Sequence, residues 1–210
     1  QALDGTILNT ALPSMAETLG ESPLQMQSVI IAYMLTVALL IPASGWLADR
    51  FGTRRIYLVA ISLFTLGSLA CAASNSLSML VAARVLQGIG GALLMPVGRL
   101  AVLRVYDKHE LLRVMSFVTI PGLLGPLMGP ALGGWLVEVA SWHWVFLINL
   151  PVGLLGFIAS WYFMPDLRQS TAKFDWQGFV MFSAGMVLVS VGLQGLGEHS
   201  ISTGWALFAL

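Results

Sequence analysis

Long apolar runs separated by short polar segments dominate the sequence. A helix needs about 20 mostly apolar residues to cross the hydrocarbon core of a bilayer. Residues 25–48 and 114–137 are each 24 positions long and contain no charged side chain. The remaining apolar stretches are 56–83, 80–103, 139–165, 176–197 and, as the exit half of a further span, 2–13. The pattern therefore predicts a chain that crosses a membrane several times as α-helices.

The composition agrees with this pattern and excludes several other classes of protein. Hydrophobic residues make up 57% of the chain and charged residues only 10%, whereas a soluble domain carries roughly 25% charged residues. The formal net charge is zero and the mean hydropathy is +0.84. These values exclude a disordered chain, a nucleic-acid binder with a basic face and an ordinary cytosolic enzyme. Cys71 is the only cysteine, and no Cys/His cluster predicts a metal site.

Basic residues are concentrated in alternate polar segments. Segments 49–55, 104–113 and 166–175 contain eight of the ten Lys and Arg residues, and the segments between them contain none. Cytoplasmic loops of membrane proteins carry an excess of Lys and Arg. We therefore expect these three segments to be cytoplasmic, with antiparallel neighbouring helices joined by short loops.

Asp4 lies in an apolar stretch, where a charged side chain costs at least about 2.5–3.5 kcal/mol. Burial in hydrocarbon disfavours the charged form of a carboxyl group unless a partner compensates it. Asp4 is therefore a candidate proton carrier or a contact for a cationic substrate. The alternative is a structural salt bridge between helices.

Arg84 and Arg99 are the two basic residues within a predicted span. Arg84, Gln87 and the glycines that follow recur at three-, four- and seven-residue spacings, which places them on one face of a helix. This face could line a cavity, or Arg84 could tie its helix to the first one. Arg99 lies near the inner end of the span, where a long side chain can reach the headgroups.

The fifth span contains a repeat of small residues. Gly125, Gly129 and Gly133 recur every four residues, which creates a groove that another helix backbone can approach closely. Prolines alternate with these glycines and remove backbone hydrogen-bond donors. We expect this span to be bent and tightly fitted, with a mechanical role.

Residues 45–55 lie between the second and third spans and resemble the cytoplasmic loop motif of the major facilitator superfamily. The resemblance implies that Asp49 is a gate carboxylate that pairs with an arginine such as Arg104. Thr53 stands where a basic residue is usual in that family. The other gate residues implied by the resemblance are Gly45, Arg50, Gly52 and Arg54.

Two further motifs strengthen the resemblance. Residues 84–88 resemble the fourth-helix motif that is associated with proton transfer in the superfamily, which implies such a role for Arg84 and Gln87. Residues 125–134 match the fifth-helix antiporter motif at each of its defined positions. The antiporter-motif residues are Gly125, Gly129, Pro130, Gly133 and Gly134.

Residues 3–13 and 142–151 resemble the first-helix motif and the start of helix six in the fourteen-helix drug:proton antiporters. His143 stands where arginine is commoner in that group. The resemblance implies an all-α polytopic membrane protein, consisting of the N-terminal six-helix bundle of the superfamily and the start of the central extra helices.

The same resemblance implies a division of the chain. Residues 1–164 form the N-terminal bundle with a truncated first helix, and residues 165–175 form a short cytoplasmic linker. Residues 176–210 form an extra central helix and the start of the next one. A C-terminal bundle is expected in a missing half of the same protein.

The function implied is proton-coupled multidrug efflux across the bacterial inner (cytoplasmic) membrane by alternating access. The partners expected are a small-molecule substrate, protons, the lipid bilayer and the missing C-terminal half, with no nucleic acid. No cofactor and no metal are expected, because the proton gradient drives the transport.

Two other functions are compatible with the sequence. Two cations within the spans, Arg84 and Arg99, outnumber the one acid, Asp4, which allows export of a small organic anion such as a carboxylate or its metal complex. A chain cut at both ends could also act as a membrane scaffold or assembly partner. An intramembrane enzyme is not expected, because the spans contain no nucleophile–base pair or metal-ligand set.

Overall fold

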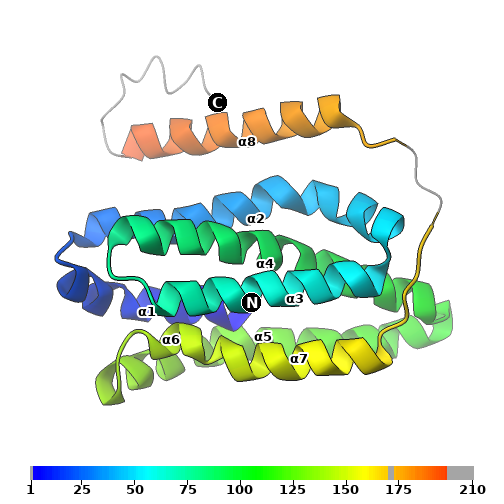
Figure 1. Cartoon of the computed structure of the whole chain (residues 1–210), viewed down its shortest axis with the longest axis horizontal. Helices are drawn as coiled ribbons and strands as arrows, with labels where there is room; N and C mark the ends of the chain where they lie inside the picture. The colour runs from blue at the N-terminus through cyan, green and yellow to red at the C-terminus, as the bar shows by residue number, and fades with distance from the viewer. Residues whose placement is uncertain (1, 170–172, 198–210) are drawn as a thin grey trace.

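The computed structural model describes residues 2–169 and 173–197, and every regular element in these ranges is an α-helix (Figure 1). The helices are α1 (Ala2–Leu19), α2 (Pro23–Phe51), α3 (Thr53–Ala72), α4 (Leu77–Val105), α5 (Lys108–Val139), α6 (Trp144–Leu147), α7 (Asn149–Phe163) and α8 (Trp176–Gly197). The predicted start of a further helix at the end of the chain lies outside the described residues.

Among the described residues, five helical segments are long and apolar enough to cross a membrane, and each overlaps a predicted span. Four of them are single helices, α2 to α5, and the fifth is Trp144–Phe163, which consists of α6 and α7. The break between α6 and α7 falls at Ile148, because Pro151 has no N–H to donate to the carbonyl group four residues earlier. The other two predicted segments are shorter: α1 has 18 residues, and Trp176–Ser190 of α8 is a shorter apolar helix.

Helix ends follow from local sequence signals. Ser22 begins α2 with a capping box, in which the Ser22 hydroxyl accepts from the Gln25 N–H and the Gln25 side chain accepts from the Ser22 N–H. Gly52 separates α2 from α3 with a φ of 100°, a value that side chains with a Cβ rarely adopt. A Cβ at Gly52 would also overlap the Asp166 carboxylate. Glycine is therefore required at this turn.

Small residues allow two helix pairs to approach closely. A Cβ at Gly67 of α3 would overlap the backbone of Gln87, and a Cβ at Gly90 of α4 would overlap the backbone of Phe64. In the α1–α5 pair, Gly129 faces Thr6 and Gly133 faces Thr10. Without an aqueous hydrophobic driving force, such close van der Waals packing holds membrane helices together.

The core lies where α1, α2 and α4 meet the segment that leads into α6. Its fully buried side chains include Ile7, Met26, Leu80, Trp142 and Phe146. By contrast, α5 and α7 expose large apolar side chains, such as Leu127 at 76% and Phe163 at 85%. Apolar exposure on this scale suits contact with lipid, because hydrocarbon chains solvate these side chains as well as a protein core does.

The three basic segments gather at one end of the helices, on the right in Figure 1. We call this the basic end. The segment after α7 crosses it and leads into α8, which packs along α2 (Figure 1). Within the predicted linker, residues 170–172 lie outside the described part of the chain.

Candidate functional site

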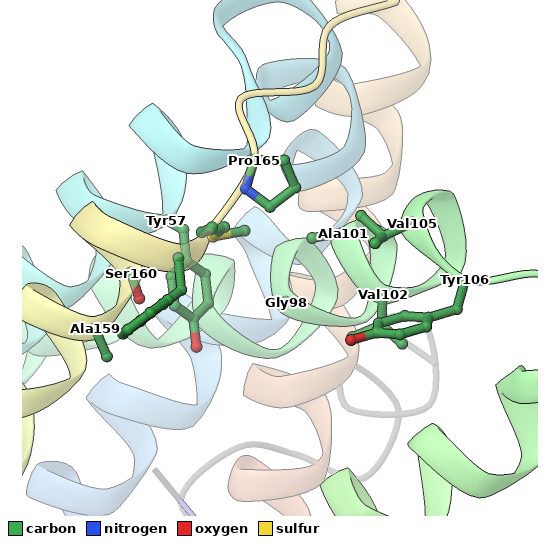
Figure 2. Close-up of a pocket in the computed structure, with 11 residues that line it drawn as sticks. Tyr57, Gly98, Ala101, Val102, Val105, Tyr106, Ala159, Ser160 and Pro165 are labelled. Atoms are coloured by element: carbon green, nitrogen blue, oxygen red, sulfur yellow. The ribbon is translucent and has the colours of Figure 1, made fainter.

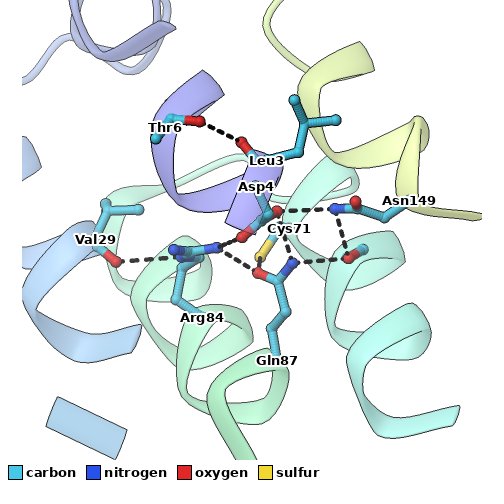
Figure 3. Close-up of polar contacts among 9 residues, drawn as sticks. Leu3, Asp4, Thr6, Val29, Cys71, Arg84, Gln87 and Asn149 are labelled. Atoms are coloured by element: carbon cyan, nitrogen blue, oxygen red, sulfur yellow. Dashed lines mark hydrogen bonds and ion pairs between the residues drawn. The ribbon is translucent and has the colours of Figure 1, made fainter. Parts of the chain in front are cut away.

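Asp4 is the centre of a buried polar cluster (Figure 3). Its Oδ2 accepts a hydrogen bond from Arg84 Nη1 at 2.8 Å, and its Oδ1 accepts from Gln87 Nε2 at 3.0 Å and Asn149 Nδ2 at 2.8 Å. Asp4 and Arg84 are each only 1% exposed. The carboxylate of α1 is thus bound directly to α4 and α7.

The positions of these groups follow from their helices. Arg84 and Gln87 are three residues apart on α4, so that they share a face, and Arg84 Nη1 also donates to Gln87 Oε1 at 2.6 Å. Asn149 is the first residue of α7. Gly67 of α3 has no side chain, so α4 can approach α3 closely at Gln87. This approach brings the Gln87 amide to the cluster.

Ser68 of α3 adds a hydroxyl group to the cluster. Its Oγ accepts from Gln87 Nε2 at 2.8 Å and from Asn149 Nδ2 at 3.3 Å. Each of the two amide groups therefore bridges Asp4 Oδ1 and Ser68 Oγ. Cys71 adds a weaker contact from its thiol to Gln87 Oε1 at 3.8 Å.

Arg84 also contacts α2. Its Nε donates to the Val29 carbonyl group at 3.3 Å, and its guanidinium carbon lies 4.1 Å from the centroid of the Tyr33 ring. The Phe146 ring lies further away, at 5.9 Å. A buried cation needs such compensation, because an unpaired charge in a low-dielectric environment is very costly.

This arrangement can couple a proton to helix packing. Oδ1 accepts two hydrogen bonds and Oδ2 accepts one. A proton on Oδ1 therefore has to displace a donor of α4 or α7, and a proton on either oxygen removes the negative charge that pairs with the Arg84 guanidinium. Because both helices hold α1 through this carboxylate, protonation weakens their attachment to α1.

The glycines of α4 do not line an opening beside Arg84. A Cβ at Gly88 would meet Thr36, and a Cβ at Gly91 would meet Tyr33. Gly98, further along α4, lies against Tyr57 and lines two cavities. In the structure Arg84 joins α4 to α1, and Gly88 and Gly91 make room for α2. The proposed role of Arg84 in proton transfer stays a prediction.

Two cavities lie along the C-terminal half of α4. Figure 2 shows one of about 370 Å³ between α3, α4 and α7, whose lining includes Tyr57, Tyr106 and Ser160. A second, of about 540 Å³, is lined by Leu3, Arg99 and residues of α5. Arg99 is exposed, and it faces this largely apolar space.

Asp49 and Arg104 form an ion pair at the basic end, as the loop motif implies. Arg104 also donates to Gln169 Oε1 at 3.2 Å, and the Gln169 N–H donates to the Asp49 carbonyl group at 3.3 Å. The pair thus joins α2 to α4 and to the segment after α7. Its role as a gate stays a prediction.

The other loop-motif residues take different places. Arg50 is exposed and lies over the rings of Trp46 and Phe51, with its guanidinium carbon 5.1 and 5.7 Å from their centroids. Arg54 is half-buried in the first turn of α3. Gly45 has open space where a Cβ would be. These residues do not join the Asp4 cluster.

Thr53, which replaces the usual basic residue, fastens residues 165–169 to the basic end. Thr53 is fully buried. Its N–H donates to the Leu167 carbonyl group at 3.0 Å and its hydroxyl donates to the Pro165 carbonyl group at 2.9 Å, while the Leu167 N–H donates to its Oγ1 at 3.1 Å. This junction therefore requires a hydroxyl group at position 53, which donates one hydrogen bond and accepts another.

We expect Thr53→Val to loosen residues 165–169, because valine keeps the shape but removes both hydroxyl hydrogen bonds. The unsatisfied Pro165 and Leu167 groups should cost about 1–3 kcal/mol. Amide hydrogen exchange at Leu167 should accelerate in this variant and stay slow in Thr53→Ser. Equal exchange in Thr53→Val and the wild type would contradict the role of the hydroxyl.

The antiporter-motif residues lie on two faces of α5. Gly129 and Gly133 are buried against α1, and the Gly125 carbonyl group accepts from the Thr6 hydroxyl at 3.5 Å. Pro130 and Gly134 are exposed. The close approach predicted for the glycine repeat is thus made by α1.

Five residues of the cluster were not predicted as site residues: Val29, Tyr33, Ser68, Cys71 and Asn149. Asn149 belongs to the 142–151 motif, and an amide inside an apolar stretch was the available signal. Ser68 and Tyr33 carry no such signal, because serine and tyrosine are common in membrane helices.

His143 lies just before the sixth span. Its Nδ1 is 3.3 Å from Ser141 Oγ, and its ring stacks on Trp142 with centroids 3.7 Å apart. Burial lowers the pKa of His143 below its ordinary value of 6.5. The neutral form is therefore favoured at pH 7, at a position where arginine is commoner in the motif that residues 142–151 resemble.

The family follows from comparison with known proteins. A family model described as Major Facilitator Superfamily matches residues 1–209. The chain belongs to the major facilitator superfamily. It is therefore an all-α, multi-pass membrane protein of this superfamily, as its sequence predicted.

Several curated members of the superfamily are similar to this chain. Proteins named "Putative multidrug resistance protein MdtD" are 58% identical over 195 residues in Pectobacterium carotovorum, covering 93% of this chain and 42% of that protein, and 55% identical over 210 residues in Salmonella paratyphi B, covering 100% and 44%. The chain thus spans less than half the length of these relatives.

Among solved structures, the peptide transporter POT in complex with sulfate has a TM-score of 0.67 and 20% sequence identity, over 98% of this chain and 44% of that one. This likeness supports the superfamily fold. It carries no information on the substrate.

Proposed function

We propose that this chain is the N-terminal part of a proton-coupled multidrug exporter of the major facilitator superfamily. The observation that carries the proposal is the buried Asp4 carboxylate, which is bound by Arg84 of α4 and Asn149 of α7. Intramembrane acids of this kind mark proton relays and substrate pathways in transporters. The names of the similar proteins support multidrug resistance as the process.

In this proposal, a proton binds Asp4 and releases a donor of α4 or α7. The helices that Asp4 joins then shift, and the substrate site opens to the other side of the membrane. Rocking of one bundle against the other around a central site is the general mode of alternating access. The missing C-terminal bundle would supply the opposite wall of the substrate site.

We further propose that the basic end faces the cytoplasm of a bacterial inner membrane. The concentration of Lys and Arg at this end supports that orientation. The ion pair of Asp49 with Arg104 would then hold the cytoplasmic side closed, and the small-residue face of α5 would limit leakage. Residues 1–164 would form the bundle, and α8 would be the first of two central extra helices.

A second candidate is export of a small organic anion. Asp4 accepts hydrogen bonds from three buried side-chain donors, whereas Arg99 is exposed and lines a cavity of about 540 Å³ with largely apolar walls. A cation in such a cavity favours an amphiphilic carboxylate. The two candidates differ in the charge of the transported molecule.

The test uses inside-out vesicles that contain the full-length transporter and an imposed pH gradient. Lipophilic cations should collapse the gradient, measured with a pH-sensitive dye, if the protein is a drug:proton antiporter. Collapse by organic anions alone would favour the second candidate. Vesicles with the transporter that respond to neither class would contradict proton-coupled export.

A further inference from the structure

Tyr33 of α2 lies directly against the charged group of the Asp4 cluster. Its side chain is buried, with 6% exposed, and its ring centroid is 4.1 Å from the guanidinium carbon of Arg84. Val29, one turn earlier on the same helix, accepts a hydrogen bond from Arg84 Nε at 3.3 Å. Helix α2 thus offers this cation two uncharged partners, a ring face and a carbonyl group.

Two glycines of α4 make room for Tyr33: Gly91 for its ring and Gly88 for its backbone carbonyl group. A Cβ at Gly91 would lie 2.6 Å from the Tyr33 hydroxyl oxygen, and a Cβ at Gly88 would lie 3.2 Å from the Tyr33 carbonyl oxygen. Any larger residue at Gly91 would push the ring away. The helix that carries Arg84 therefore also provides the space that holds Tyr33 beside it.

The charged and titratable groups around Asp4 come from three helices. They are Arg84 of α4, Cys71 of α3 and Tyr33 of α2. Helix α7 contributes the neutral Asn149, and α5 meets α1 nearby through Gly125 and Gly129. Arg84 is thus the cation that compensates the Asp4 carboxylate.

Protonation of Asp4 weakens one interaction of Arg84 and leaves its contacts with α2 in place. When Asp4 is ionised, its carboxylate neutralises the guanidinium charge. When Asp4 is protonated, that compensation is lost, and the cation depends on its remaining acceptors in a low-dielectric environment. A desolvated ring face attracts a cation more strongly than an exposed one, so Tyr33 stabilises the protonated state more than the ionised one.

We propose that Tyr33 is a positioning residue that sets the proton affinity of Asp4 by holding Arg84 when the carboxylate is neutral. The proposal deepens the proposed function and rests on it, because it assumes that Asp4 exchanges a proton. It assigns α2 a part in coupling, because Arg84 keeps its contacts with Val29 and Tyr33 of α2 when its hydrogen bond to Asp4 of α1 breaks.

The test is an infrared titration of the full-length transporter. The C=O stretching band of protonated Asp4 is identified as the band that is missing in Asp4→Asn. In Tyr33→Leu, the midpoint of this band should move to lower pH by about 0.5 to 1 unit, which is a three- to tenfold loss of proton affinity. Tyr33→Met should shift it in the same direction, and Tyr33→Phe, which keeps the ring, should stay at the wild-type midpoint.

Tyr57→Leu is the matched control, because Tyr57 also covers a glycine of α4, Gly98. Within the described part of the chain, the guanidinium groups that lie over rings are those of Arg50 and Arg84, and Tyr57 faces neither. Tyr57→Leu should therefore keep the wild-type midpoint.

The outcomes separate this proposal from the proposed function. Equal midpoints in Tyr33→Leu, Tyr33→Met and the wild type would overturn the assignment of Tyr33 and leave Asp4 as the proton carrier. An equal shift in Tyr57→Leu would overturn it too, because loss of packing would then explain the effect. A wild-type titration without an Asp4 band would overturn the carrier role itself, and the role of Tyr33 with it.

Discussion

Asp4→Asn is expected to reduce proton-coupled export to the level of vesicles without transporter. Asparagine is nearly isosteric with aspartate but cannot take up a proton in the accessible pH range. Its NH2 group would also face a hydrogen-bond donor, because both Asp4 oxygens accept hydrogen bonds. The measurement is dissipation of an imposed pH gradient on addition of substrate, at matched protein abundance.

The control for this prediction is Asp107→Asn. Asp107 precedes α5 at the basic end, is exposed and makes no side-chain hydrogen bond to the helix that it caps. This variant should transport at the wild-type rate. If Asp4→Asn dissipates the gradient as fast as the wild type does, Asp4 is not the coupling site.

Arg84→Leu is expected to have the largest effect on stability. The substitution removes the cation from a pair that is almost completely buried, and it leaves the Asp4 carboxylate without its charge partner. Breaking a buried ion pair in this way costs about 3 to 5 kcal/mol. Thermal unfolding of the purified transporter in detergent should show a correspondingly lower midpoint at neutral pH.

The loss in Arg84→Leu should depend on pH. Without Arg84, the folded protein favours a protonated Asp4, whereas the unfolded chain ionises normally. The folded state then binds more protons than the unfolded state, so stability rises as the pH falls. The variant should therefore recover part of its stability at mildly acidic pH, and the double variant Arg84→Leu with Asp4→Asn should recover part of it at neutral pH.

Arg99→Leu is the comparison for a cation on the same helix. Arg99 is exposed, and surface substitutions usually change stability by no more than about 0.5 kcal/mol. A loss as large as that of Arg84→Leu in this variant, or an Arg84→Leu protein as stable as the wild type, would contradict the importance of the buried pair.

The spans and their boundaries were largely predictable. The predicted runs at 25–48 and 114–137 lie inside α2 and α5, whose ends are a few residues further out. The reason is physical and local: each segment has to match the thickness of the hydrocarbon core and satisfy its own backbone. Asp4 and Arg84 were conspicuous for a local reason too, because a charge within a membrane span is costly whichever helices pack around it.

The partners of these residues could be predicted only in part. The resemblance implied Arg104 as a partner of Asp49, and the structure contains that pair. Asn149 is 145 residues from Asp4, and no local pattern relates the two. Thr53 looked like the loss of a positive charge, but it holds Pro165 and Leu167 through its hydroxyl group.

The sequence by itself determined that this protein is a helical membrane protein, which segments are long and apolar enough to cross a bilayer, which polar segments are basic and which side chains are out of place in hydrocarbon. These properties depend on residues taken along one helix at a time. The tertiary structure decided which helices share the Asp4 carboxylate, which helix fills the glycine repeat of α5 and where Tyr33 lies relative to Arg84. Such contacts depend on how the helices are arranged around one another, because hydrogen bonds and close packing are satisfied between segments that the sequence alone does not bring together.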